Sequence, residues 1–386
     1  MIVSQVTGTN DSFTADELGR LSSIQPHLVF AFWSKKYLQT PPFFAQLRQS
    51  LPQAALIGCS TSGDVNAEGT NDDTIVLTAI RLERAKVRVF EEDGVAAEAE
   101  QAAGQRLAEA ILREGKALGE PLAGVFGFGP GMYFNGGAFI QGLTGNLPAG
   151  VPVSGGLAGD HVAFVKTLVL GPLGVGDRKV AAVALYGGAL RMRVHAGAGW
   201  GAFGPTRKVT ACHGNLLMEF DGESALDLYK KYLGEYAVDL PGSALLFPLE
   251  LLDAQKGSTN VYRAVLGVDE DKKIMSLAGS IKDGDYARFM HASLDELVDA
   301  AEQVGVDCAA EHFTGPTLAM VTSCVGRKMV MGTRVDEEIM VVGDQLGGNV
   351  TLAGFYSNGE VCPDRGGQGF ALNNQTLVVA LLTEDA

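Results

Sequence analysis

The sequence of 386 residues contains little cysteine, and its cysteines form no metal or disulfide pattern. Only five are present, an odd number without C-x-x-C spacing, so we predict neither a zinc site nor a disulfide framework. The six histidines are scattered, and no pair has the H-x-x-x-H spacing of a metal site. Because reduced thiols are typical of the cytoplasm, we expect a cytoplasmic protein.

Basic residues and long apolar runs are also in short supply. Lys and Arg number 30 against 45 Asp and Glu, which gives a formal net charge of −15 at pH 7. This acidity disfavours binding to nucleic-acid phosphates or to an anionic membrane surface, so neither partner is expected. The longest apolar runs have about 8 residues, far fewer than a membrane-spanning helix needs, and the amino terminus lacks a basic-then-apolar signal.

Readable catalytic motifs are missing as well. The sequence has no G-x-S-x-G nucleophile elbow and no pair of carboxylates spaced along a helix. Gly127-Phe-Gly-Pro-Gly131 resembles a phosphate-binding loop, but Met132 replaces the third glycine of G-x-G-x-x-G. A protein without catalytic activity is therefore the first hypothesis. The alternative is an enzyme with Cys59 or Ser60 as the nucleophile and His161 as its base.

Glycine, by contrast, is plentiful, with 50 residues, and it marks a pattern that occurs three times. Three small-residue loops each follow an apolar run and end in Gly plus an acid: Cys59–Asp64, Gly155–Asp160 and Tyr356–Glu360. An earlier apolar run precedes each loop, and these runs begin at Leu28, Leu122 and Leu318. An apolar strand that starts with Thr follows each loop, and these strands begin at Thr74, Thr167 and Thr376. We interpret this order as a three-fold internal strand-helix-strand repeat.

The predicted fold is α/β, with mixed sheets in two packed lobes. Strand and helix signals alternate, but hairpin signals are interspersed, which favours mixed over purely parallel sheets. The length suits two domains, and no low-complexity linker separates them, so we place the boundary near Asp221 between packed lobes.

Local signals predict several individual elements. Thr14 and Glu17 have the spacing of a helix capping box, and Pro41-Pro42 opens a second helix. Gly187-Gly188 predicts a hairpin between strands 179–186 and 191–196. The charged turn Asp269–Lys273 predicts another hairpin.

The three loops are predicted to face a common region and to bind a small polar ligand. In open α/β sheets, ligands lie at loops beyond the carboxyl ends of strands, and hydroxyls, amides and a carboxylate could hold such a molecule. The alternative is that the loops are tight turns in which the acid caps the next element. The predicted ligand-binding residues are Cys59, Ser60, Thr61, Ser62, Asp64, Asp160, His161, Arg327, Tyr356, Ser357, Asn358 and Glu360.

Arg327 joins this set because it follows the apolar run of the third unit at the place where a ligand loop is expected. A guanidinium group can bind a carboxylate through two parallel hydrogen bonds. A solvated turn containing Arg327 and Lys328 is the alternative.

Several stretches, in this order, resemble the FIST family. LIGCSTSGDV, VSGGLAGD and VTACHGNLL resemble a FIST N-terminal domain, which we assign to residues 1–220, and SCVGRKMVMG and LAGFYSNGEV resemble a FIST C-terminal domain, which we assign to residues 221–386. The resemblance implies a bacterial intracellular sensor of small ligands. Such a sensor would act through a separate partner, such as a histidine kinase, a cyclic-di-GMP enzyme or a chemotaxis protein.

The family resemblance also raises haem as an alternative ligand, because one branch contains haem-binding nitric-oxide sensors of about this length. Asn373 stands where family members commonly have a histidine, so a haem here would need another axial ligand. His161 is the first choice, followed by Cys59 and Cys362, with Arg327 and Lys328 as the cations near the propionates.

Overall fold

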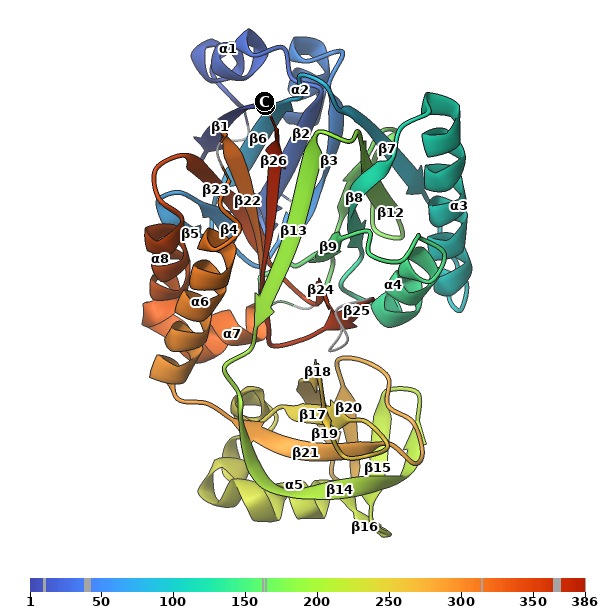
Figure 1. Cartoon of the computed structure of the whole chain (residues 1–386). Coiled ribbons are helices and arrows are strands. Elements are labelled where there is room, and N and C mark those ends of the chain that lie inside the picture. Colours follow the sequence, from blue (N-terminus) through green and yellow to red (C-terminus); the bar gives the residue numbers. More distant parts are fainter. Residues whose placement is uncertain are drawn as a thin grey trace.

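A computed structural model describes residues 1–9, 12–37, 43–161, 163, 165–313, 315–363 and 369–385. Three six-stranded sheets and their helices form the upper part of Figure 1, and a fourth sheet lies below them. We call the upper part the three-sheet body. The chain leaves it after β13 (Leu190–Gly197) and returns to it at α6 (Leu294–Ala309).

The strands of each six-stranded sheet come from distant parts of the chain. The first sheet, in the order β1-β6-β2-β3-β10-β11, contains β1 (Ile2–Gly8), β2 (Leu28–Ser34), β3 (Ala55–Thr61), β6 (Ile75–Arg81), β10 (Val169–Gly171) and β11 (Gly174–Gly176). The second sheet, in the order β7-β12-β8-β9-β24-β25, contains β7 (Lys86–Glu92), β8 (Leu122–Gly129), β9 (Val153–Leu157), β12 (Val180–Tyr186), β24 (Glu360–Pro363) and β25 (Phe370–Asn373). The third sheet, in the order β13-β26-β22-β23-β4-β5, contains β13, β4 (Asp64–Asn66), β5 (Gly69–Asn71), β22 (Thr317–Cys324), β23 (Val350–Ser357) and β26 (Leu377–Glu384).

Each of these sheets has one parallel pair at its centre and ends in a hairpin from elsewhere in the chain. The parallel pairs are β2–β3, β8–β9 and β22–β23. The added hairpins are β10–β11 in the first sheet, β24–β25 in the second and β4–β5 in the third. The three sheets are thereby linked in a closed ring, and the predicted α/β fold with mixed sheets is confirmed.

Helices cover the outer faces of the three sheets (Figure 1). They are α1 (Ala15–Ser23) and α2 (Phe43–Ser50) on the first sheet, α3 (Glu100–Leu118) and α4 (Gly136–Thr144) on the second, and α6 and α8 (Val335–Leu346) on the third. Helix α7 (Val325–Met331) lies at the lower end of the third sheet (Figure 1). The capping box of Thr14 and Glu17 is confirmed, whereas the helix start at Pro41-Pro42 lies outside the described residues. In the described part of the chain, no helix has both the length and the apolar character needed to span a bilayer.

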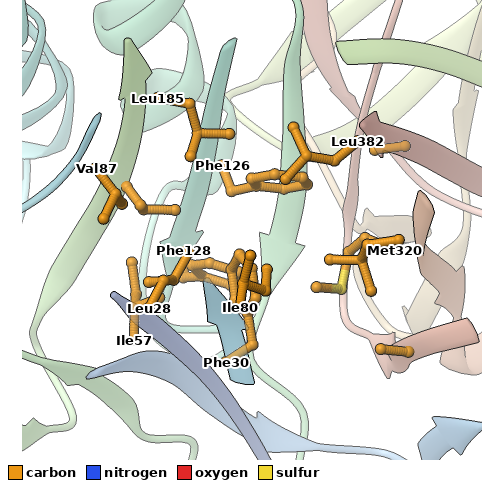
Figure 2. Close-up of a cluster of buried hydrophobic side chains, with 14 of the residues drawn as sticks. Leu28, Phe30, Ile57, Ile80, Val87, Phe126, Phe128, Leu185, Met320 and Leu382 are labelled. Carbon is orange, nitrogen blue, oxygen red and sulfur yellow. The ribbon is translucent and has the colours of Figure 1, made fainter. Parts of the chain in front are cut away.

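The inner faces of the sheets meet in one apolar core, shown in Figure 2. Phe30 of the first sheet and Phe126 of the second have ring centroids 5.4 Å apart, and Phe32 stacks on Phe355 of the third sheet at 4.7 Å. Because the central strands are covered on both faces, they are continuous apolar runs rather than alternating ones.

The lower part is built on an antiparallel sheet in the order β18-β17-β21-β14-β15-β20-β19, with β16 paired to β15. Its elements are β14 (Gly201–His213), β15 (Leu216–Phe220), β16 (Glu223–Ser224), α5 (Ala225–Leu233), β17 (Leu249–Leu252), β18 (Ser258–Arg263), β19 (Val265–Asp269), β20 (Ile274–Leu277) and β21 (Tyr286–His291). It also contains the short 3-10 helices η2 (Gly234–Asp239) and η3 (Gly242–Leu246), whereas η1 (Lys35–Tyr37) and η4 (Gly332–Arg334) belong to the three-sheet body. The β19–β20 hairpin is confirmed, and the expected boundary at Asp221 falls inside this sheet, between β15 and β16.

The hairpin predicted at Gly187-Gly188 is wrong. Strand β12 pairs with β7 on one side and β8 on the other, so both of its edges are occupied. Strand β13 therefore leaves the second sheet and pairs with β26 of the third. Two glycines permit a tight reversal, but they do not determine which strand the next segment joins.

Replacing Gly354 with alanine is expected to destabilise the protein by about 3 kcal/mol, at the upper end of the usual cost of overpacking a core. An added Cβ would lie 1.9 Å from the carbonyl oxygen of Val321 on the neighbouring strand, and a main-chain atom cannot move aside cheaply. Urea unfolding monitored by circular dichroism would measure the change. Gly19→Ala in α1 is the control: its Cβ meets nothing within 4 Å, so we expect a gain of about 0.5–1 kcal/mol. A cost in the control as large as that of Gly354→Ala would contradict the steric explanation.

Candidate functional site

The three small-residue loops lie side by side and are joined through their main chains. The first loop (59–64) bonds the third (356–360) through Ser62 N to Tyr356 O and Tyr356 N to Gly63 O, both 2.8 Å. The third loop bonds the second (155–160) through Asn358 N to Leu157 O, at 3.1 Å. The second loop returns to the first through Gly159 N to Ser60 O, at 2.8 Å. The structure thus brings all three loops together at the ends of the central strands.

Asp64 of the first loop is fully buried and is held by two hydroxyl groups. Thr61 Oγ1 donates to its Oδ1 at 2.6 Å and Thr74 Oγ1 donates to its Oδ2 at 2.8 Å. Burial raises the pKa of Asp64 to about 7, although these hydroxyls and the Lys328 ammonium act in the opposite direction. A carboxylate with this pKa changes charge near neutral pH.

Glu360 of the third loop is held in the same way. Ser357 Oγ donates to Oε1 at 2.6 Å and Thr376 Oγ1 donates to Oε2 at 2.9 Å. The group is fully buried, and burial raises the pKa of Glu360 to about 8, against the lowering effect of those bonds. The first and third loops therefore contain equivalent buried acids.

Asp160 of the second loop differs in its partners. Its Oδ2 accepts main-chain bonds from Val165 N at 2.7 Å and Lys166 N at 2.9 Å. The acid therefore binds the main chain of Val165 and Lys166, as in the alternative interpretation of the loops as tight turns.

The side chains of Cys59 and Ser60 are enclosed in the three-sheet body. Cys59 belongs to the central apolar core, where burial raises the pKa of its thiol well above the usual value. Ser60 Oγ donates to Gly159 O at 2.7 Å and accepts from Leu168 N at 2.9 Å. A nucleophile needs a base that can take its proton, and these contacts of Ser60 are with main-chain groups. The arrangement does not favour the hydrolase-like alternative.

His161 lies at the surface beside a small charged cluster. Its Nε2 is 3.6 Å from Asp72 Oδ2, and its side chain is 41 % exposed. Lys328 Nζ pairs with the same Asp72 and donates to Ser62 O at 2.9 Å. Ser62 Oγ in turn donates to His161 O at 2.8 Å. This cluster connects the first and second loops to α7.

Arg327 is fully buried and forms an ion pair with Glu338 of α8. Its Nε donates to Glu338 Oε2 at 2.7 Å, and Tyr356 OH donates to Glu338 Oε1 at 3.0 Å. The other guanidinium nitrogens donate to main-chain carbonyl groups, one of them that of Ala198. Arg327 therefore anchors the segment by which the chain leaves the three-sheet body.

A cavity of about 290 Å³ lies where the three-sheet body meets the lower sheet. Its wall includes the exit segment Ala196–Gly199, with Asn260 and Tyr262 from β18. Cys362, Pro363, Asn373 and Thr376 complete the wall from the β24–β25 region. Thr376 also binds Glu360, so the cavity adjoins the third loop. Its volume is at the lower end of the range of about 300–1,000 Å³ for ligand pockets.

Asn373 joins the two sides of this cavity. Its Oδ1 accepts from Tyr262 N at 2.6 Å, and its Nδ2 donates to Asn260 O and, at 3.3 Å, to Cys362 Sγ. A side-chain amide offers both an acceptor and two donors, and here it uses both kinds. The residue that departs from the family pattern thus connects β25 to β18.

The residues proposed as axial ligands do not fit a haem. His161 is half-exposed beside Asp72 and Lys328, and Cys59 is enclosed in the packed core. Cys362 lines a cavity at the small end of the ligand range and accepts a bond from Asn373. Within the described residues, no three His, Cys, Asp or Glu side chains are grouped so that they could hold a metal ion.

Sequence reasoning missed most of the cavity wall. Asn260, Tyr262 and the exit segment have no motif and belong to different parts of the chain. One signal did exist: Asn373 stood out as a departure from the family pattern, and it lies in this wall. The replacement of the expected histidine by Asn373 was interpreted only as the loss of an axial haem ligand. Interpreting it as a change in a binding site would have pointed to this cavity.

Two known domain families match this chain. The FIST N domain matches residues 27–223, and the FIST C domain matches residues 225–363. No curated protein matches the sequence. The two matches meet at Ser224, the last residue of β16, and together they cover most of the chain. The chain therefore belongs to the FIST family of sensory or signalling domains.

Proposed function

We propose that this protein is an intracellular sensor that binds a small ligand and signals through a separate partner protein. The ligand site is the cavity of about 290 Å³ lined by Asn373, which we call the Asn373 cavity. The observation that carries the proposal is the position of the cavity between the three-sheet body and the lower sheet. A ligand there would contact elements of both parts, including the segment that connects them.

The exit segment gives the ligand a way to act on the rest of the molecule. Ala196–Gly199 lines the cavity, and Arg327 holds the carbonyl of Ala198. A ligand changes a conformational equilibrium only when it binds one state more tightly than another. A molecule bridging this segment and β18 would favour one arrangement of the two parts over others.

The three loops support the cavity in this proposal. Most of the predicted ligand-binding residues are buried and bonded within the protein, as Thr61 and Glu360 illustrate. The three loops would hold the β24–β25 region in place through the bond between Thr376 and Glu360, while the ligand itself contacts the cavity wall.

We also propose that the three-sheet body consists of three copies of one unit. The equivalent strand orders and the equivalent settings of Asp64 and Glu360 support it. On this view the FIST N-terminal domain, residues 1–220, holds two units and the FIST C-terminal domain, residues 221–386, holds the third, packed as two lobes. Partners of the kinds named for the family, a histidine kinase, a cyclic-di-GMP enzyme or a chemotaxis protein, would receive the signal.

Ligand binding at the cavity can be tested with a thermal-shift screen of small molecules followed by Ala196→Phe. A ligand at 100 times its dissociation constant adds about 2.7 kcal/mol to the stability of the folded state. Ala196 is exposed and lines the cavity, so a phenyl group there should fill the space without disturbing the core. We expect the shift produced by a genuine ligand to disappear in Ala196→Phe.

Ala202→Phe is the matched control, because Ala202 is an exposed alanine of β14 that does not line the cavity. The ligand-induced shift should persist in this variant. A shift that survives Ala196→Phe unchanged would show that the ligand binds elsewhere.

A further inference from the structure

A larger cavity, of about 470 Å³, lies in the three-sheet body where the first and second sheets meet. The end of α2 and the start of β3 form one side, and β7 forms the other. Ala55 and Val89 provide half-buried apolar side chains in its wall, and Pro172 of the β10–β11 turn also lines it. None of these residues lines the Asn373 cavity.

The charge of this cavity is opposite to that of the protein. Arg48, Lys86 and Arg88 line it together with His27, and the wall contains no Asp or Glu within the described residues. The whole chain has 30 Lys and Arg against 45 Asp and Glu, so a wall whose described residues include three cations and no acid is opposite in sign to the net charge of the chain. A local positive potential in a hollow concentrates anions there.

The positive groups keep hydrogen-bond donors for a ligand. Arg88 Nε pairs with Glu114 at 2.9 Å and Lys86 Nζ lies 3.4 Å from Glu120, both acids standing outside the wall. These pairs are between half-exposed side chains, and such pairs contribute little, so an anion can compete with them. Arg48 donates through one Nη to Pro172 O, and a guanidinium group carries five N–H donors in all.

The adjacent strands add main-chain groups to the wall. Strand β7 is the edge of the second sheet, with β12 as its neighbour. Strand β10 pairs with β3 only at Gly58 and Cys59, beyond the part of β3 that lines the cavity. Edge strands present N–H groups that can bind an acceptor.

We propose that this cavity is a binding site for a small organic anion carrying a phosphate or carboxylate group. Arg48 and Arg88 bind the anionic group from opposite sides, and the half-buried apolar side chains of Ala55 and Val89 contact the remainder of the molecule. The protein then has a second ligand site, distinct from the Asn373 cavity.

Isothermal titration calorimetry at low ionic strength tests the site with glucose 6-phosphate, succinate and inorganic phosphate, and with glucose as the uncharged comparison. We expect saturable binding of at least one anion and none of glucose. Arg48→Gln and Arg88→Gln should each weaken that binding about tenfold or more, as loss of a charge-assisted hydrogen bond does. Added salt should weaken it as well.

Arg106→Gln is the matched control, because it removes the same charge from Arg106 of α3, which pairs with Glu92 of β7 and does not line the cavity. Binding in this variant should stay within about twofold of the unmodified protein, a change of under half a kcal/mol. Equal weakening in Arg106→Gln, or equal binding of glucose and glucose 6-phosphate, would overturn the proposal. So would the absence of saturable binding of all three anions up to about 10 mM, where even millimolar affinity gives a signal.

Discussion

Replacing Glu338 with alanine is expected to lower the free energy of unfolding by about 3–5 kcal/mol, because it leaves the guanidinium of Arg327 buried without its counter-charge. Both side chains are fully buried, so water cannot replace the lost partner. Ser323 Oγ at 2.6 Å and Tyr356 OH at 3.0 Å also donate to Glu338 and would lose their acceptor. Urea unfolding followed by circular dichroism would measure the loss.

The neighbouring residue provides a control for this prediction. Glu337 pairs with Arg334, but both side chains are more than a third exposed, so Glu337→Ala should cost less than about 1 kcal/mol. A double variant, Arg327→Met with Glu338→Leu, should recover much of the stability because it removes both buried charges at once. If Glu337→Ala and Glu338→Ala had equal effects, burial would not be what makes the Arg327–Glu338 pair important.

Asp64 is expected to make the protein less stable as the pH rises. Its pKa is about 7 in the folded protein, whereas the ordinary pKa of an aspartate, 3.8, applies to the unfolded chain. At pH values between these two pKa values, Asp64 is protonated in the folded state and ionised in the unfolded state. Its contribution to the free energy of unfolding is fully present below about pH 4 and is lost as the pH rises through about 7. Three units of pKa correspond to about 4 kcal/mol.

Asp64→Asn isolates this contribution, since asparagine does not titrate. Relative to the variant, the unmodified protein should lose about 4 kcal/mol of unfolding free energy between pH 4 and pH 8, measured by urea unfolding at several pH values. Relative to Glu360→Gln, the unmodified protein should likewise lose stability as the pH rises from about 4.5 to about 8, because burial raises the pKa of Glu360 from 4.5 to about 8. Asp16→Asn, at an exposed position in α1, is expected to leave the pH dependence unchanged. Parallel pH curves for Asp64→Asn and the unmodified protein would contradict the prediction.

These two predictions concern residues that the sequence singled out for a different reason. Arg327 and Asp64 were predicted to contact a ligand, and the sequence showed only that they follow apolar runs. The structure pairs Arg327 with Glu338 and places Asp64 between two threonine hydroxyls. Residue type and spacing identified polar groups at strand ends, but only the packing around them decides whether they face solvent, a ligand or one another.

The sequence by itself determined the local elements of this protein. The capping box at Thr14, the β19–β20 turn and the apolar central strands follow from interactions between residues a few positions apart, and each is present. The three small-residue loops at strand ends were also recognisable. These features depend on backbone preference and hydrophobic periodicity, which a short stretch expresses without its tertiary contacts.

Only the tertiary structure decided which strands became neighbours and where the cavities lie. Gly187-Gly188 did not pair β12 with β13, because β7 and β8 already occupied both edges of β12. The β24–β25 hairpin joined the second sheet, far from its neighbours in sequence, and carried Asn373 to Tyr262. An open strand edge can pair with any compatible segment, so the choice depends on the packing of the whole chain rather than on local pattern.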